Sequence, residues 1–214
     1  MAGTRIWDLP TRLFHWVLAT LVVFSVVTAK VGGLWMDWHM RSGYAILALV
    51  LFRILWGFAG SHYARFGSFV RSPAVVLAYL RGQVGHVAGH SPLGALSVIA
   101  LLSALLLQAT TGLFTSDDSF TEGPLARLAS GTVVDRTSTI HRYGEWAIFV
   151  LVGLHLTAIA YYASVRSAVL VGPMITGKHP SHVIVEVEDS ASMRMRALVF
   201  SAIAAGLVGY LVTL

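Results

Sequence analysis

The sequence predicts an all-α membrane protein, a transmembrane bundle of four core helices with a fifth transmembrane helix at the C-terminus. Of the 214 residues, 56% are hydrophobic and only 12% are charged, which is too apolar for a soluble domain of this length. Long apolar stretches also recur along the chain, each close to the ~20 residues that a helix needs to cross a bilayer. Five spans and their connections account for the whole length, so we expect a single transmembrane domain over residues 1–214. The expected spans are residues 13–29, 39–58, 93–115, 139–163 and 197–214.

Each of the first two spans carries a histidine close to its start. The chain enters residues 13–29 through Arg5 and Arg12, and His15 lies in the first turn of this span. No small-residue cleavage site follows a short apolar core, so we expect no removable signal peptide. The second span begins at His39, after a connection that contains a glycine pair. His15 and His39 are therefore expected at opposite faces of the membrane.

The third span has neither histidine nor charge, and polar connections flank it. Residues 61–92 carry arginines and no acid, and the stretch RSPAVVLAYLRG within them predicts a helix that lies in the membrane interface. Residues 93–115 hold small and polar side chains suited to helix contacts, so we interpret this span as a packing helix. Residues 116–137 predict a net acidic loop.

The charges of the chain indicate topology. There are 15 Lys and Arg against 10 Asp and Glu, but the basic residues form no patch with aromatic side chains, so we expect no nucleic-acid partner. They concentrate at the N-terminus and in the second and fourth connections, which the positive-inside rule assigns to the cytoplasm. The N-terminus is therefore expected inside and the C-terminus in the periplasm. The absence of cysteine excludes disulfides and iron–sulfur clusters held by this chain.

The fourth span holds the most informative pattern, His141 and His155 in one apolar helix. Fourteen residues at ~1.5 Å each separate the two rings by about 21 Å along the helix axis. At a rotation of ~100° per residue, the two side chains point within about 40° of the same direction. Both imidazoles therefore face the same way, one near each side of the bilayer. Ionisable side chains inside a membrane are costly and usually functional, although a capping histidine and a buried structural histidine would also give this pattern.

The topology gives each of these histidines a partner at its own depth. The fourth span enters from outside, so His141 matches His39 at the outer face and His155 matches His15 at the inner face. Ligation of two haems by two imidazoles each requires two pairs of histidines, and the members of each pair must come from different helices at the same depth. We therefore predict four iron ligands, in the pairs His39 with His141 and His15 with His155, and no catalytic residue.

Glycines and arginines near these histidines are candidates for haem contacts. Gly43 and Gly144 each follow an outer ligand by about one turn and leave room for a flat macrocycle, a role that ordinary helix packing explains equally well. Arginines near each level are candidate partners of haem propionates, or else interfacial charges. Arg53 is the most informative of them, because an arginine deep in an apolar helix needs a partner. The arginines are Arg41 and Arg142 at the outer level and Arg12 and Arg53 at the inner level.

The remaining histidines fall in connections on the expected cytoplasmic side. His86 and His90 have the spacing of two metal ligands on a helix, but GHVAGHSP carries glycine and proline where that helix would have to form. We expect a solvated or interfacial role and leave all of these histidines out of the site. They are His62, His86, His90, His179 and His182.

Several segments, in order along nearly the whole chain, resemble the bacterial cytochrome b561 family, in the branch grouped with the cytochrome b subunit of nickel–iron hydrogenases. They are WDLPTRLFHWVLA, HMRSGYAILALVLFRILWGFAG, GHSPLGALSVIALLSALLLQATTGLF, IHRYGEW followed by GLHLTA, and LVGPMITGKHP. The resemblance implies two haem b groups in the bacterial inner membrane, held by the same two histidine pairs. It says less about the fifth span, because the shortest members of the family end after four.

The resemblance also implies electron transfer across the membrane between the quinone pool and a periplasmic redox partner, either a c-type cytochrome or a hydrogenase. Two haems at different depths suit sequential one-electron transfer. Quinone is then the expected substrate. The sequence leaves open whether the protein is an enzyme in its own right, with quinone oxidoreductase activity, and whether it forms an oligomer.

Other functions stay open at this level. Relatives that oxidise superoxide outside and reduce quinone suggest a stand-alone superoxide:quinone oxidoreductase. A haem-free transporter with a histidine proton relay belongs to another class, but the spans lack carboxylates apart from Glu145 and none looks broken at mid-depth. A pure membrane anchor for a larger complex is the remaining alternative.

Overall fold

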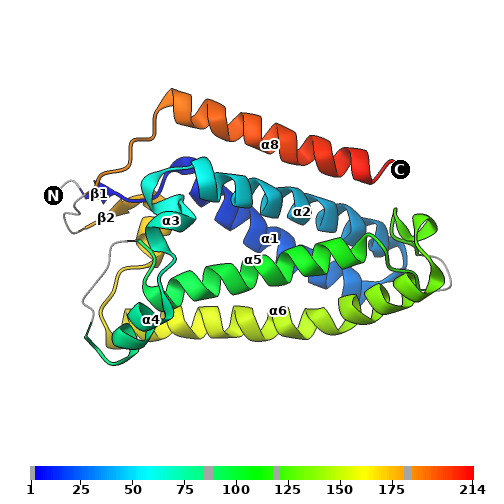
Figure 1. The fold of residues 1–214 in the computed structure, drawn as a ribbon, viewed down its shortest axis with the longest axis horizontal. Coiled ribbons are helices and arrows are strands. Elements are labelled where there is room, and N and C mark those ends of the chain that lie inside the picture. Colours follow the sequence, from blue (N-terminus) through cyan, green and yellow to red (C-terminus); the bar gives the residue numbers. More distant parts are fainter. Residues whose placement is uncertain (1–2, 84–88, 118–120, 181–184) are drawn as a thin grey trace. The chain divides into compact units, whose positions relative to one another are not determined.

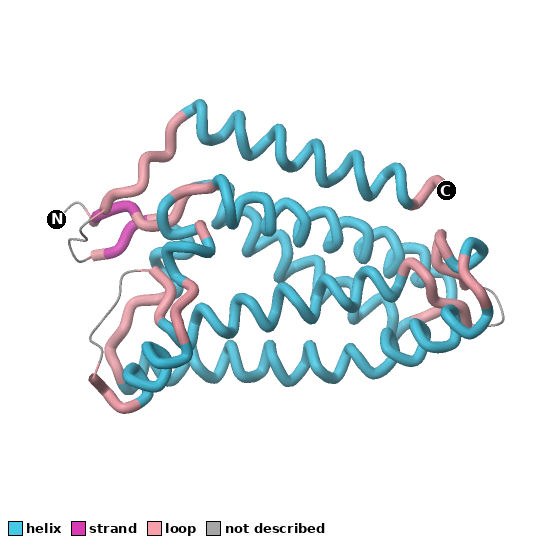
Figure 2. Tube along the Cα trace, viewed as in Figure 1, coloured by secondary structure: helices cyan, strands magenta, loops and turns pink. Residues whose placement is uncertain are grey.

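The computed structural model describes residues 3–83, 89–117, 121–180 and 185–214. Within these residues, five helices are long and apolar enough to cross a membrane, which confirms an all-α membrane helix bundle. Figure 1 labels the elements, and Figure 2 shows how much of the described chain is helical. The long helices are α1 (Leu9–Val31), α2 (Met36–Ala59), α5 (Pro92–Gly112), α6 (Gly131–Val165) and α8 (Ala191–Leu211).

Short elements lie in the connections. Two strands that the sequence did not predict, β1 (Thr4–Arg5) and β2 (Lys178–His179), pair antiparallel with Thr4 opposite His179. The helix expected within RSPAVVLAYLRG is present as α4, while its place in the membrane interface stays a prediction. The short helical elements are η1 (Gly33–Trp35), η2 (His62–Ala64), α3 (Phe66–Phe69), α4 (Pro73–Leu80), η3 (Ala126–Leu128) and α7 (Val171–Thr176).

The structure corrects one end of the fourth span. Helix α6 begins at Gly131, so residues 131–137 are helical instead of belonging to the expected acidic loop. The backbone carbonyl of Ser130 accepts hydrogen bonds from the amides of Val133 and Val134, at 2.9 and 3.1 Å. The Thr137 hydroxyl donates to the carbonyl of Phe114 at 3.1 Å, which ties these first turns to the segment after α5. His141 is consequently well inside the helix and not at its entrance.

The reversal between α1 and α2 depends on the glycine pair. Gly32 and Gly33 have φ angles of 67° and 57°, in the left-handed region that side chains with a Cβ rarely adopt. The amide of Trp35 then donates to the carbonyl of Gly32 at 3.1 Å and closes the turn. This local chemistry is what brings the start of α2 back beside the end of α1.

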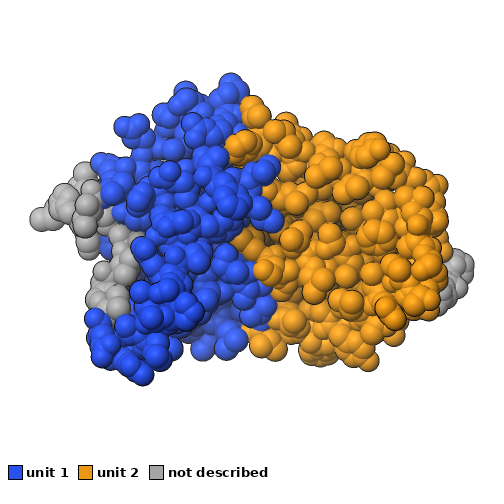
Figure 3. Space-filling view, viewed as in Figure 1, with its two compact units in different colours: residues 1–13, 53–101, 151–198 blue, residues 14–52, 102–150, 199–214 orange. Residues whose placement is uncertain are grey.

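The chain divides into two compact units, which Figure 3 colours separately. The first unit comprises residues 1–13, 53–101 and 151–198, and the second comprises residues 14–52, 102–150 and 199–214. The division falls inside each of the long helices. The expectation of a single domain over the whole chain stays a prediction.

Each unit has its own core. In the first unit, Ile6, Trp7, Tyr63 and Val187 are buried together, so the N-terminal segment packs against the segments around α3 and before α8. In the second unit, α2, α5, the connection after α5 and α8 meet through buried side chains. Helix α8 is therefore part of this core and not a detached appendage. The buried residues of the second core are Leu47, Leu113, Leu125 and Val208.

Candidate functional site

Two of the predicted ligands meet in the second unit. The rings of His39 in α2 and His141 in α6 lie 6.1 Å apart, centroid to centroid, with an interplanar angle of 77°. An imidazole nitrogen binds a transition metal at about 2.0–2.1 Å and the ring centre lies about 1.1 Å behind it, so two ligand rings on one ion stand about 6 Å apart. The observed separation of 6.1 Å is therefore one at which both imidazoles could hold a single metal ion.

The hydrogen bonds of both rings leave the same nitrogen for a metal. His39 Nδ1 lies 2.9 Å from the carbonyl oxygen of Ser25, and His141 Nδ1 lies 2.8 Å from the carbonyl oxygen of Gln108. A carbonyl can only accept, so both Nδ1 atoms carry the hydrogen and Nε2 is the basic nitrogen of each ring. Backbone partners of this kind fix the tautomer and orientation of metal-binding histidines.

A cavity of about 520 Å³ opens beside the two rings and lies wholly within the second unit. That volume is within the range of cofactor and ligand pockets in proteins. Gly43 lines the cavity, and a Cβ added there would meet no atom within 4 Å, so this residue leaves open space one turn from His39. The donor set and the space therefore fit a haem held by two imidazoles.

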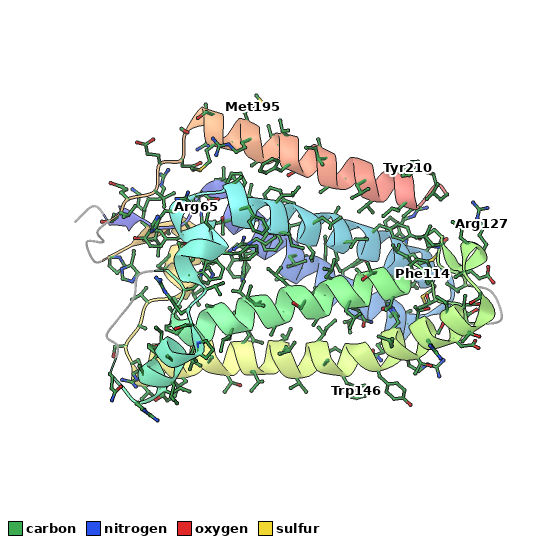
Figure 4. All side chains as sticks on the ribbon, in the orientation of Figure 1. Arg65, Phe114, Arg127, Trp146, Met195 and Tyr210 are labelled. Atoms are coloured by element: carbon green, nitrogen blue, oxygen red, sulfur yellow. The ribbon has the colours of Figure 1, made fainter. Side chains whose placement is uncertain are left out.

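The cavity also has charged lining residues. Lys30 from α1 and Glu145 from α6 form an ion pair with Nζ 2.8 Å from Oε2, and both line the cavity together with Arg142 and Asp117. Glu145 lies one helical turn beyond His141. The remaining wall is largely apolar, and on the opposite, exposed face of α6 lies Trp146 (Figure 4).

Two residues of the expected set lie elsewhere. A Cβ on Gly144 would overlap the side-chain oxygen of Gln108, so Gly144 makes room for that amide and is not a lining residue of the cavity. The guanidinium of Arg41 lies 5.3 Å from the ring centre of Trp38, and both side chains are exposed. Neither arrangement brings these residues to the open space.

The inner-level residues are divided between the units. His15 belongs to the second unit and His155 to the first, and both are half-buried. The ring of His15 contacts that of Trp16 at 5.0 Å between centroids. Their pairing as ligands stays a prediction.

Two arginines of the first unit each have a buried nitrogen with no hydrogen-bond partner among residues 3–83, 89–117, 121–180 and 185–214. Arg53 is 2% exposed, and its guanidinium lies 5.3 Å from the ring centre of Phe66. Arg12 donates from Nη1 to the carbonyl of Ile175 at 2.6 Å. Among the residues that the structure describes, Arg53 Nη1 and Arg12 Nε have no hydrogen-bond acceptor. Buried cationic donors of this kind call for an anionic acceptor.

His90 packs among aromatic rings and is not simply solvated, while the expected place of this residue at the membrane interface stays a prediction. Its ring lies 4.3 Å from that of Phe69 and 4.9 Å from that of Trp7, and its Nδ1 is buried. Burial, and then the positive charge of Arg53, lower the pKa of His90 to about 3, so the ring is neutral. Of the other connection histidines, His62 is exposed, whereas His86 and His182 lie outside the described residues.

Sequence reasoning missed the residues that orient the two rings. The third span was interpreted only as a packing helix, yet Gln108 of α5 contacts His141 through both its backbone and its side chain. A Cβ on Gly112 would lie 2.9 Å from Cε1 of His141, so this glycine gives the ring access to the Gln108 carbonyl. The available signal was a glutamine followed four residues later by a glycine, in an apolar span that has no charged residue.

The sequence matches the family model of prokaryotic cytochrome b561 over residues 6–177. The chain belongs to this family. Two curated relatives agree, each called a probable Ni/Fe-hydrogenase B-type cytochrome subunit. The relative from Azotobacter chroococcum is 25% identical over 209 residues, covering 80% of this chain and 86% of the relative. The relative from Cupriavidus necator is 24% identical over 216 residues, covering 82% and 86%.

No solved structure matches the chain significantly. Membership of the cytochrome b561 family, together with the spanning helices, makes this a multi-pass bacterial membrane protein. As a cytochrome b it carries electrons in the membrane with haem b as its prosthetic group.

Proposed function

We propose that this cytochrome b561 holds two haem b groups, an outer one between His39 and His141 and an inner one between His15 and His155. Electrons then pass through the bundle between the quinone pool and a periplasmic redox partner. The observation that carries the proposal is the arrangement of His39 and His141, with ring centroids 6.1 Å apart and both Nδ1 atoms bonded to backbone carbonyls.

The arginines have distinct roles in this proposal. Arg12 Nε and Arg53 Nη1, which find no acceptor within the described part of the chain, are the proposed donors to the propionates of the inner haem. Arg142 lines the outer cavity and is the proposed partner of an outer propionate, whereas Arg41 lies on the exposed surface against Trp38 and has no such role in this proposal. Gly43 is the proposed point of close approach for the outer macrocycle.

The haem irons supply one-electron chemistry when bound, and the chain holds and tunes them. Its carbonyls at Ser25 and Gln108 orient the outer ligands. Its apolar walls exclude water, and Lys30, Glu145 and Arg142 set the local charge.

The first candidate partner is a nickel–iron hydrogenase on the periplasmic side, because both curated relatives carry the name of its B-type cytochrome subunit. A c-type cytochrome is the second candidate. With the N-terminus in the cytoplasm and the C-terminus in the periplasm, the outer haem faces this partner and the quinone exchanges electrons with the other haem.

A redox titration of the absorption spectrum, combined with haem quantitation, tests the proposal. We expect two b-type haems per chain with two resolvable potentials. Purified protein with one haem or none, or with a spectrum that no reductant changes, would contradict it. The partner is then tested by measuring hydrogen-dependent quinone reduction in membranes that contain the candidate hydrogenase. A rate that is the same with and without this chain would exclude that hydrogenase as the partner.

Ligand variants test the assignment of each pair. His39→Ala and His141→Ala should each abolish the same haem and its step in the redox titration. His15→Ala and His155→Ala should each abolish the second haem and its step. His62→Ala is the matched control, because this histidine is exposed. Loss of different haems from His39→Ala and His141→Ala would refute the pairing.

A further inference from the structure

Gln108 holds His141 at two points. Its backbone carbonyl accepts from Nδ1 of the imidazole at 2.8 Å, and its side-chain amide donates from Nε2 to the backbone carbonyl of His141, also at 2.8 Å. The ring and the helix that carries it are therefore both fixed by one residue of α5. Thr111 adds a longer contact, with its hydroxyl 3.5 Å from the same Nδ1.

Two glycines clear the space for this contact. Gly112 of α5 leaves room for the imidazole, whose Cε1 and Nδ1 would lie 2.9 and 3.2 Å from an added Cβ. Gly144 of α6 leaves room for the Gln108 amide, whose oxygen an added Cβ would overlap. The side chain of Gln108 thus fits into a gap that a single methyl group on α6 would close.

The other ligand is held differently. The ring of His39 bonds to the Ser25 carbonyl at 2.9 Å, and the Ser25 hydroxyl lies 3.1 Å from the same nitrogen. For the described residues, these contacts reach the ring of His39 and not the backbone that carries it. The backbone carbonyl of His39 accepts from the Ser42 hydroxyl of its own helix at 2.8 Å. Among the described residues, His141 is therefore the ligand whose ring and backbone are both held by one residue of another helix.

We propose that Gln108 is the positioning residue of the His39–His141 site, and that its side chain, admitted by Gly144, sets the redox potential of the haem bound there. This inference rests on the proposed function. The amide keeps α5 and α6 at the separation at which the Gln108 carbonyl accepts from Nδ1–H. A strong bond at Nδ1 makes Nε2 a better electron donor, which favours ferric iron.

Removing the amide should therefore raise the potential of this haem. In Gln108→Ala we expect the ratio of ferric to ferrous affinity to fall about tenfold, which for one electron is a rise of about 59 mV. The potential of the other haem should not change. Leu107→Ala is the matched control, because this neighbouring side chain of α5 is 53% exposed. If Gln108→Ala does not accumulate, Gln108→Met keeps the length of the side chain without its donor and should show the same rise.

A double-mutant cycle separates this role from general packing. Gly144→Ala should displace the amide and raise the same potential, and it should add nothing in the Gln108→Ala background. Gly153→Ala is its control on α6, because a Cβ there meets nothing within 4 Å. Unchanged potentials and electron paramagnetic resonance spectra in the Gln108 variants would overturn the proposal, and so would additive effects of the two substitutions.

The same measurements distinguish this inference from the proposed function. If no haem of the wild-type protein is lost in both His39→Ala and His141→Ala, the haem assignment itself is wrong. If that haem is present and titrates identically in wild type and in Gln108→Met, only the role of Gln108 is wrong.

Discussion

Lys30 and Glu145 join α1 to α6 beside the candidate haem cavity, with Nζ 2.8 Å from one carboxylate oxygen and 2.9 Å from the other. Their side chains are 58% and 27% exposed, so the ion pair contributes little to the free energy of unfolding. We expect the pair to act chiefly through its charges on the neighbouring cavity. Because Glu145 lies one turn from His141, its charge acts on the proposed outer iron.

The two charges should move the outer potential in opposite directions. A nearby negative charge favours ferric iron, so Glu145→Gln should raise the potential and Lys30→Met should lower it, each by an amount on the order of tens of millivolts. The double variant should return close to the wild-type value. Spectroelectrochemical titration measures all three, and shifts of the same sign in both single variants would contradict the placement of this pair beside the haem.

Gly43 tests whether the cavity is the cofactor space. A Cβ there meets no atom within 4 Å, so Gly43→Leu should fold normally and fill the cavity. We expect haem content to drop by one per chain, with the His39–His141 haem missing from the spectrum. Gly206→Leu is the matched control, because Gly206 also has open space around it in α8. Full haem content in Gly43→Leu would show that the cavity is not used.

Asp8 anchors the start of α1 to the end of α2. It is 0% exposed, its Oδ1 accepts from the Thr11 amide at 2.6 Å, and its Oδ2 accepts from the Trp56 indole and the Ser61 hydroxyl. Asp8→Ala takes this acceptor from the Thr11 amide and the Ser61 hydroxyl, while the Trp56 indole keeps the Thr11 hydroxyl at 3.2 Å. It also removes a negative charge near Arg53, so we expect a loss of about 3 kcal/mol in unfolding free energy.

Thermal unfolding in detergent measures this loss. The control is Asp37→Ala, which removes an exposed acid from the first turn of α2 and should change the midpoint little. Equal midpoints for Asp8→Ala and wild type would show that the Asp8 cluster contributes nothing to stability.

His90 predicts a pH dependence of stability. Its pKa is about 3 in the folded protein, below the ordinary histidine value of 6.5 that applies to the unfolded chain. Between these two pH values the unfolded chain binds a proton on this histidine that the folded protein does not bind. The contribution of His90 to the free energy of unfolding is therefore complete above pH 6.5. It is lost as pH falls toward 3, by at most about 1.4 kcal/mol per pH unit. His90→Phe should remove this part of the slope between pH 6.5 and 4, whereas His62→Phe, at an exposed site, should retain it. Parallel pH profiles of wild type and His90→Phe would refute the prediction.

The sequence and the structure agree where a local pattern carries the information. The five spans, the glycine turn at Gly32–Gly33 and the helix within residues 73–80 follow from hydropathy and turn chemistry that short segments hold by themselves. The early start of α6 was missed, because Asp135 and Arg136 made residues 131–137 look like a loop. Contacts such as that between Thr137 and the Phe114 carbonyl stabilise helix there.

The sequence by itself determined that this is a membrane helix bundle of the cytochrome b561 family, and it singled out His39 and His141 through their depth. Hydropathy and helical spacing are sufficient for the bundle and for the histidines, because the bilayer fixes the length of a span and the helix fixes which residues share a face. The family follows instead from sequence segments that resemble its members. Only the tertiary structure decided that Gln108, Ser25 and Gly112 orient those rings, that Gly144 makes room for an amide, and that His90 packs against Phe69 and Trp7. These relationships join residues far apart in the chain, and no local pattern specifies which backbone carbonyl a ring nitrogen will reach.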